Sequence, residues 1–139
     1  FRTKQLDAVW TVEPWVSRLE AETGGKVAVE EPQAVTTVLV ASERTLTEQR
    51  AIVAAFVAAH RELTEWIKAN PAEAQAMAQK ELAEEVRGAV SDDLIARAWK
   101  RITLVDRVDA GALNTFVDNA RKAGFMRTAP DLSRLIETP

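Results

Sequence analysis

Aromatic, hydroxyl and carboxylate side chains gather in one short run near the start of the chain, LDAVWTVEPW at residues 6–15. Residues 6–12 have the composition of a short buried strand. Pro14 suits the first position of a helix, where its missing N–H group costs nothing. Ligands of open α/β sheets bind just past the carboxyl ends of strands, near helix N-termini. We therefore predict that four side chains of this run border a small-molecule cleft: Trp10, Thr11, Glu13 and Trp15.

Each of these side chains also has a plainer interpretation. Tryptophan is usually mostly buried, so Trp10 and Trp15 could be core anchors. Glu13 could simply cap the helix that follows, because a carboxylate is stabilised by the positive end of the helix dipole. Glu13 would also repel an anionic ligand unless a cation screened it. Backbone N–H groups, together with Thr11, would then bind the anion.

Composition excludes several classes of function. The net charge of −3 and the pI near 5.3 argue against nucleic acid or an anionic membrane as a partner. The chain has no cysteine, and its single histidine, His60, cannot build a metal site or a catalytic triad alone. No glycine-rich phosphate loop or catalytic-serine motif is present. We predict a protein that is not an enzyme, with no catalytic residue, no metal and no cofactor.

The spacing of apolar residues predicts the elements that position the candidate site. Three runs are typical of strands, at residues 6–12, 26–30 and 34–42, and the last is β-branched and uncharged. Apolar residues three and four apart predict helices instead. These helices are expected at residues 14–23 (ended by Gly24-Gly25), 47–69 (capped by Thr47) and 71–82 (capped by Asn70), and after caps at Ser91, Asp109 and Asp131. The order predicts an α/β fold with few strands early and then mostly helices.

Three blocks of the sequence carry a resemblance to a known family. They are LDAVWTVEPWVSRLEAETGG, then AVTTVLVAS, then AIVAAFVAAHRELTEWIKANPAEA. In this order they resemble the substrate-binding proteins of ABC importers that take up aliphatic sulfonates, taurine, nitrate and thiamine precursors. The resemblance extends over essentially the whole chain. The family's mature proteins are longer, so it implies the C-terminal portion of a two-lobed type II periplasmic-binding fold.

The resemblance also implies a domain arrangement, a function and a location. Residues 1–31 would end the second lobe, and residues 32–139 would supply a hinge strand and the helices that complete the first lobe. The parent protein would be periplasmic, or extracellular and membrane-anchored. It would bind a small sulfonate, nitrate-like or heteroaromatic solute between its lobes and dock on an ABC permease. The chain alone would lack part of the cleft and is expected to self-associate.

Three other classes remain open from the sequence. One is a cytoplasmic effector-sensing domain of a transcription regulator with the same fold, which a helix-turn-helix elsewhere in the protein would identify. A second is an enzyme, since some relatives in thiamine-precursor metabolism catalyse reactions. The third is a free-standing helical interaction module. A signal peptide or lipid-attachment site would instead select transport.

Overall fold

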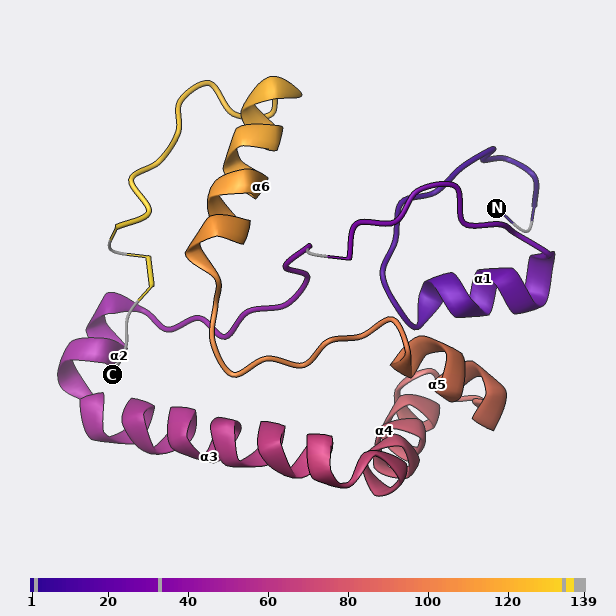
Figure 1. The fold of residues 1–139 in the computed structure, drawn as a ribbon, viewed down its shortest axis with the longest axis horizontal. Helices are drawn as coiled ribbons and strands as arrows, with labels where there is room; N and C mark the ends of the chain where they lie inside the picture. The colour runs from indigo at the N-terminus through magenta and orange to yellow at the C-terminus, as the bar shows by residue number, and fades with distance from the viewer. Residues whose placement is uncertain (2, 33, 134, 137–139) are drawn as a thin grey trace. The chain divides into compact units, whose positions relative to one another are not determined.

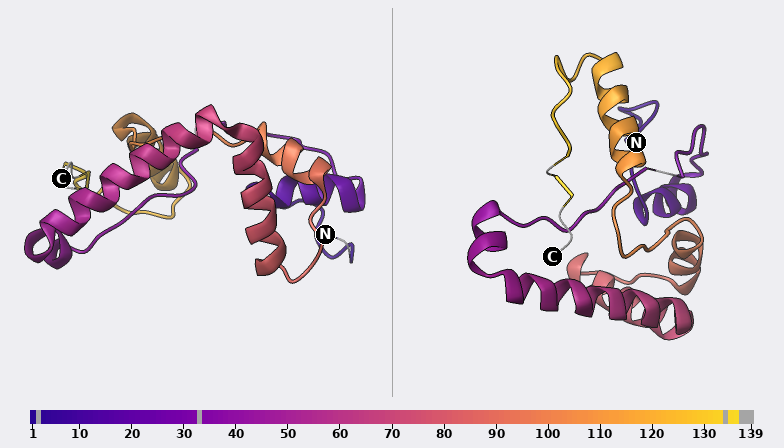
Figure 2. Two further views of the ribbon diagram at one scale, coloured as in Figure 1. Left: turned by 90° about the horizontal axis from the view of Figure 1, so that it is seen from below. Right: turned by 60° about the vertical axis from the view of Figure 1, so that its left-hand side comes forward.

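The regular secondary structure is helical in the computed structural model, which describes residues 1, 3–32, 34–133 and 135–136 (Figure 1). No strand occurs among these residues, and two further views show the same helices joined by extended segments (Figure 2). The helices are α1 (Trp15–Thr23), α2 (Glu43–Glu48), α3 (Arg50–Ala69), α4 (Pro71–Glu85), α5 (Asp92–Trp99) and α6 (Ala110–Lys122).

The predicted α/β fold with early strands is therefore wrong for the described residues. Residues 6–12, 26–30 and 34–42 lie outside helices, and no ladder of backbone hydrogen bonds joins their described parts into a sheet. The run at 34–42 is exposed: Val38, Leu39 and Val40 keep 44%, 57% and 78% of their surface in contact with solvent. The physical reason is that strand propensity reflects packing on a paired, half-buried surface. A β-rich run without a pairing partner therefore forms no strand.

Local signals at helix ends were more reliable. The helix predicted at residues 14–23 is confirmed as α1, and Gly24 ends it with a φ of 68°, the left-handed conformation that glycine adopts without a Cβ clash. Ser91 caps α5, because its Oγ accepts a hydrogen bond from Leu94 N. Asp109 caps α6 in the same way, through Ala112 N. These predictions succeed because a cap involves only residues adjacent in sequence.

Other predicted ends need correction. The long helix predicted from Thr47 is two helices, and the cap is Ser42, whose Oγ accepts from Thr45 N at the start of α2. Asn70 precedes α4 but makes no side-chain cap, since its Nδ2 donates to Trp66 O at the end of α3. The final helix predicted after Asp131 is absent from the described residues there, which form a turn in which Asp131 accepts from Ser133 N.

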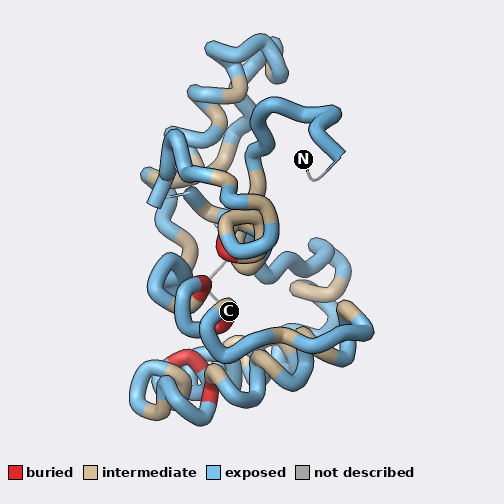
Figure 3. The backbone as a smooth tube through the Cα atoms, turned by 90° about the vertical axis from the view of Figure 1, so that its right-hand side faces the viewer, coloured by how far each residue is buried: buried red, intermediate tan, exposed pale blue. Residues whose placement is uncertain are grey.

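The chain forms two compact units, and α1, α4 and α5 belong to the first, residues 1–32 with 66–104. In this unit α5 packs against both α1 and α4. The buried positions on these helices hold mainly small side chains, which let helix backbones approach closely; they are Ser17, Ala74, Ile95 and Ala98 (Figure 3). The assignment of residues 1–31 and 32–139 to two lobes of a larger protein stays a prediction.

The second unit comprises the described residues of 33–65 and 105–139 and holds α2, most of α3 and α6. Three apolar side chains of α3 are exposed to solvent: Ile52, Phe56 and Leu63 are 66%, 58% and 52% exposed. Residues 130–133 and Ile136 line a hollow of about 390 Å³ together with the start of α6. Among the described residues, no helix has the length and apolar character needed to cross a membrane.

Hydrogen–deuterium exchange will test the absence of a sheet. We expect backbone amides at residues 34–42 to exchange at rates close to those of an unfolded peptide, because no ladder protects them. Amides in α4 should exchange more slowly and serve as the internal control. Slow exchange at 34–42 would show that this run is a paired strand.

Substitution of Ser17 will test the packing of the first unit. Its side chain is fully buried and its Oγ has no hydrogen-bond partner. Ser17→Ala should leave the free energy of unfolding unchanged or raise it by up to ~1 kcal/mol, because it removes an unsatisfied polar atom. Ser17→Leu should lower it by about 1–3 kcal/mol through overpacking. Chemical denaturation followed by circular dichroism measures both, and a large loss in the alanine variant would contradict this packing.

Candidate binding site at the Glu-Pro-Trp motif

The turn into α1 uses its own backbone and Glu13 to satisfy the start of the helix. Val12 O accepts hydrogen bonds from Trp15 N at 3.0 Å and Val16 N at 3.3 Å. The next N–H group, that of Ser17, donates to Glu13 Oε2 at 3.1 Å. Pro14 is the N-cap residue rather than the first helical residue. The N–H groups that could have bound an anion at this helix terminus are therefore already paired.

Glu13 is held by both of its carboxylate oxygens. Oε2 accepts from Ser17 N, and Oε1 accepts from a guanidinium nitrogen of Arg101 at 3.1 Å. The side chain of Glu13 is only 7% exposed and that of Arg101 is 34% exposed, so water reaches this ion pair mainly from the arginine side. A carboxylate with this much burial needs a cation or several hydrogen-bond donors. Glu13 has one cation, Arg101, and one backbone donor, the N–H group of Ser17. It is thus engaged within the protein rather than free to accept from a ligand.

Arg101 also binds two further carboxylates of the first unit. It donates to both oxygens of Glu20, at 2.8 and 3.1 Å, which is the bidentate geometry of a strong arginine–carboxylate pair. Its Nε lies 3.6 Å from Glu30 Oε1. We call Arg101, Glu13, Glu20 and Glu30 the Arg101 cluster. The Arg101 cluster carries a net negative charge, because it holds three carboxylates and one guanidinium.

The hydrogen bonds in this cluster stabilise its charged forms. The bond from Arg101 lowers the pKa of Glu20 below its usual value, although partial burial opposes this. The bonds to Glu20 first, and to Glu13 second, raise the pKa of Arg101. The lowered pKa of Glu20 and the raised pKa of Arg101 both favour the charged ion pair at neutral pH.

The two motif tryptophans are at the surface. Trp10 is 74% exposed and Trp15 is 41% exposed, so neither is a core anchor. Thr11, which lies between the two tryptophans in the sequence, is half-buried. The guanidinium of Arg18 lies over the Trp15 ring, 5.8 Å from its centroid, and is itself paired with Glu22 at 2.6 Å. The motif therefore presents aromatic surface beside a carboxylate whose own bonds are made internally.

The four predicted site residues thus have unequal roles in the structure. Trp10 and Trp15 offer accessible rings, Thr11 is partly accessible, and Glu13 faces inward to Ser17 and Arg101. Whether they bind a ligand stays a prediction. The sequence analysis missed Arg101, which lies 88 residues beyond Glu13. The available signal was the seven-residue spacing of Glu13, just before α1, and Glu20 within it, since two helical turns can bring both carboxylates to one side, where a single cation could pair with them.

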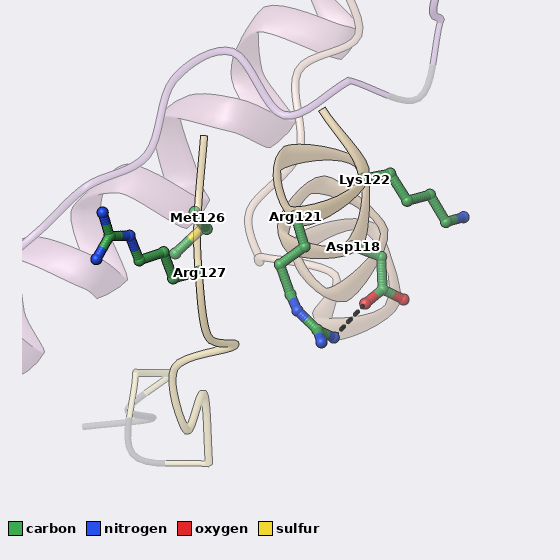
Figure 4. Close-up of a pocket in the computed structure, with 5 residues that line it drawn as sticks. All are labelled: Asp118, Arg121, Lys122, Met126 and Arg127. Atoms are coloured by element: carbon green, nitrogen blue, oxygen red, sulfur yellow. Dashed lines mark ion pairs between the residues drawn. The ribbon is translucent and has the colours of Figure 1, made fainter. Parts of the chain in front are cut away.

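A second hollow, of about 310 Å³, lies at the end of α6 and is lined by Asp118, Arg121, Lys122, Met126 and Arg127. Its cations do not converge: Arg121 is directed toward Asp118, 3.9 Å away, while Lys122 and Arg127 point to opposite sides (Figure 4). The part of the chain that the structure describes contains no group of acidic or histidine side chains able to hold a metal ion, and His60 is exposed. The Glu-Pro-Trp motif therefore remains the better candidate.

Comparison with known proteins identifies the family. Residues 1–82 match the family model of the NMT1-like family, so the chain belongs to that family. The match includes the Glu-Pro-Trp motif and α1 to most of α4 and ends before Arg101. No curated protein and no solved structure matches the chain. Membership indicates, at the level of class, a solute-binding protein of ABC transporters.

The lowered pKa of Glu20 predicts an acid-dependent loss of stability. Its pKa in the folded chain lies below the usual value of 4.5, so the ion pair contributes fully above that pH. The contribution should fall as the pH drops below 4.5 and vanish once the folded carboxylate is protonated. Glu20→Gln should remove this part of the pH dependence. Denaturation curves from pH 7 to 3 measure it, and identical slopes in both proteins would contradict the pair.

Proposed function

We propose that this chain is part of an extracytoplasmic solute-binding protein of an ABC importer, and that Trp10 and Trp15 contact the solute. The family match supports the class of protein. The observation that carries the site is the exposure of both rings beside the inward-facing Glu13. Exposed aromatic side chains are enriched where proteins bind ligands, because they bury a large area at a small entropic cost.

Of the solute classes that the sequence suggests, the contacts favour a heteroaromatic molecule over a sulfonate or nitrate. An oxyanion needs free N–H donors or an unpaired cation. The N–H groups at the start of α1 are bonded, and Arg101 already binds carboxylates. The net negative charge of the Arg101 cluster would further repel an anion. A neutral or weakly basic ring can instead stack on Trp10 or Trp15.

The protein's location and its docking on a permease belong to the same proposal, and the family match supports them. A periplasmic or membrane-anchored receptor captures its solute outside the cytoplasm and delivers it without making or breaking a bond. The exposed apolar side chains of the chain also favour self-association when it is studied alone, among them Trp10, Val29, Val40, Ile52 and Phe56.

The solute-binding proposal predicts that substitution of Trp15 weakens solute binding more than it lowers stability. Trp15→Ala should raise the Kd for a bound solute by about tenfold, equivalent to ~1.4 kcal/mol. It should lower the free energy of unfolding by less than ~1 kcal/mol, because the ring is partly exposed. Isothermal titration with substituted pyrimidines, nitrate, taurine and short alkanesulfonates measures the affinity in the full chain.

Phe125→Ala is the matched control, since Phe125 is 86% exposed and lies outside the matched family region. It should leave both affinity and stability unchanged. Tight binding of nitrate or sulfonate with no binding of pyrimidines would contradict the preference for a ring. An unchanged Kd in Trp15→Ala, with a large loss of stability, would show that Trp15 is a structural residue.

A further inference from the structure

We propose that Arg101 is a positioning residue for the Glu-Pro-Trp motif. It would hold the Glu13 carboxylate inside the protein and thereby set the orientation in which Trp15, and Trp10 before it, are presented. The consequence for solute binding rests on the proposed function, whereas the positioning itself does not. Arg101 lies outside the region that matches the family model, so membership of the family does not assign it this role.

The first support is the connectivity of Arg101. It lies in the turn just after α5, where its backbone N–H donates to Ala98 O. From there its guanidinium reaches three places along the N-terminal segment: Glu13 before α1, Glu20 within α1, and Glu30 after α1. A planar guanidinium has five N–H donors in a fixed arrangement, so bonding to Glu20 orients the donor that binds Glu13.

The second support is the burial and dual bonding of Glu13. Its side chain is 7% exposed, while that of Arg101 is 34% exposed. Without Arg101, Glu13 would keep only the hydrogen bond from Ser17 N and would carry an uncompensated, nearly buried charge. The carboxylate would then turn toward water. Since Glu13 is joined through Pro14 to Trp15, that movement would change the environment of the Trp15 ring.

A purely structural role for Arg101 makes a different prediction. If Arg101 only joined α5 to α1, the two bonds to Glu20 would carry its effect, because Glu20 lies within α1. Removing the Glu20 charge would then disturb the motif as much as removing Arg101. If Arg101 positions Glu13, the changes at Arg101 and Glu13 should instead be coupled, and the change at Glu20 should have the smaller effect on the tryptophans.

Fluorine NMR of the full chain, with 5-fluorotryptophan at all tryptophans, measures the effect of each variant on the tryptophan environments without a ligand. Trp→Phe variants assign the resonances. We expect Arg101→Met and Glu13→Gln each to shift the Trp15 resonance, and the double variant to shift it no further than one of them. Glu20→Gln should produce a smaller shift. Arg44→Met is the matched control, because Arg44 lies on α2 in the second unit and pairs with Glu48, and it should produce none.

Equal shifts in Arg101→Met and Glu20→Gln, or additive shifts in the double variant, would overturn the positioning role. If Arg101→Met fails to fold, the comparison of Glu13→Gln with Glu20→Gln decides in its place. Arg101→Lys should restore the Trp15 resonance only in part, since an ammonium group cannot bind Glu20 with two parallel bonds and reach Glu13 as well.

Titration of the same variants with a solute that binds the unmodified chain extends the test to function. The Kd should rise several-fold in Arg101→Met and less in Glu20→Gln. If the unmodified chain binds none of the solutes, the proposed function fails, and the fluorine spectra still decide whether Arg101 positions the motif. If a solute binds and the two variants have the same Kd, the positioning role fails while the proposed function stands.

Discussion

The Arg101 guanidinium is the contact on which the first unit depends, because it joins segments that no sheet holds together. Residues 6–12 and 26–31 lie outside helices and lack a ladder of hydrogen bonds, so their backbones do not fix their position. Arg101 binds Glu13, Glu20 and Glu30 from the end of α5. A bidentate pair with a partly buried carboxylate is directional, unlike an exposed ion pair on a helix surface.

The packing around this contact explains why one cation matters so much. The buried side chains of α1, α4 and α5 are mainly small, namely Ser17, Ala74 and Ala98 beside Ile95. Small side chains allow close helix packing but remove little apolar area from water, so each contributes little to the hydrophobic free energy. The two directional bonds from Arg101 to Glu20 are then a specific contact between the turn after α5 and α1.

This arrangement also separates two tasks within one motif. Glu13 satisfies the start of α1 and receives Arg101, while Trp10 and Trp15 remain accessible. A carboxylate that is bonded internally holds the backbone of the turn, so under the proposed function the rings beside it would meet a solute without ordering a flexible loop. Such preorganisation reduces the entropic cost of binding.

The sequence by itself determined the features that depend on neighbouring residues: the span of α1, its end at Gly24, the caps at Ser91 and Asp109, and the family resemblance of the N-terminal blocks. Only the tertiary structure decided that the β-rich runs form no strand in the described residues, that Ile52 and Phe56 are exposed, and that Glu13 bonds to Arg101. Helix ends are set by hydrogen bonds within a few residues, so local sequence predicts them. Strand pairing, burial and an ion pair across 88 residues need partners that local pattern cannot specify.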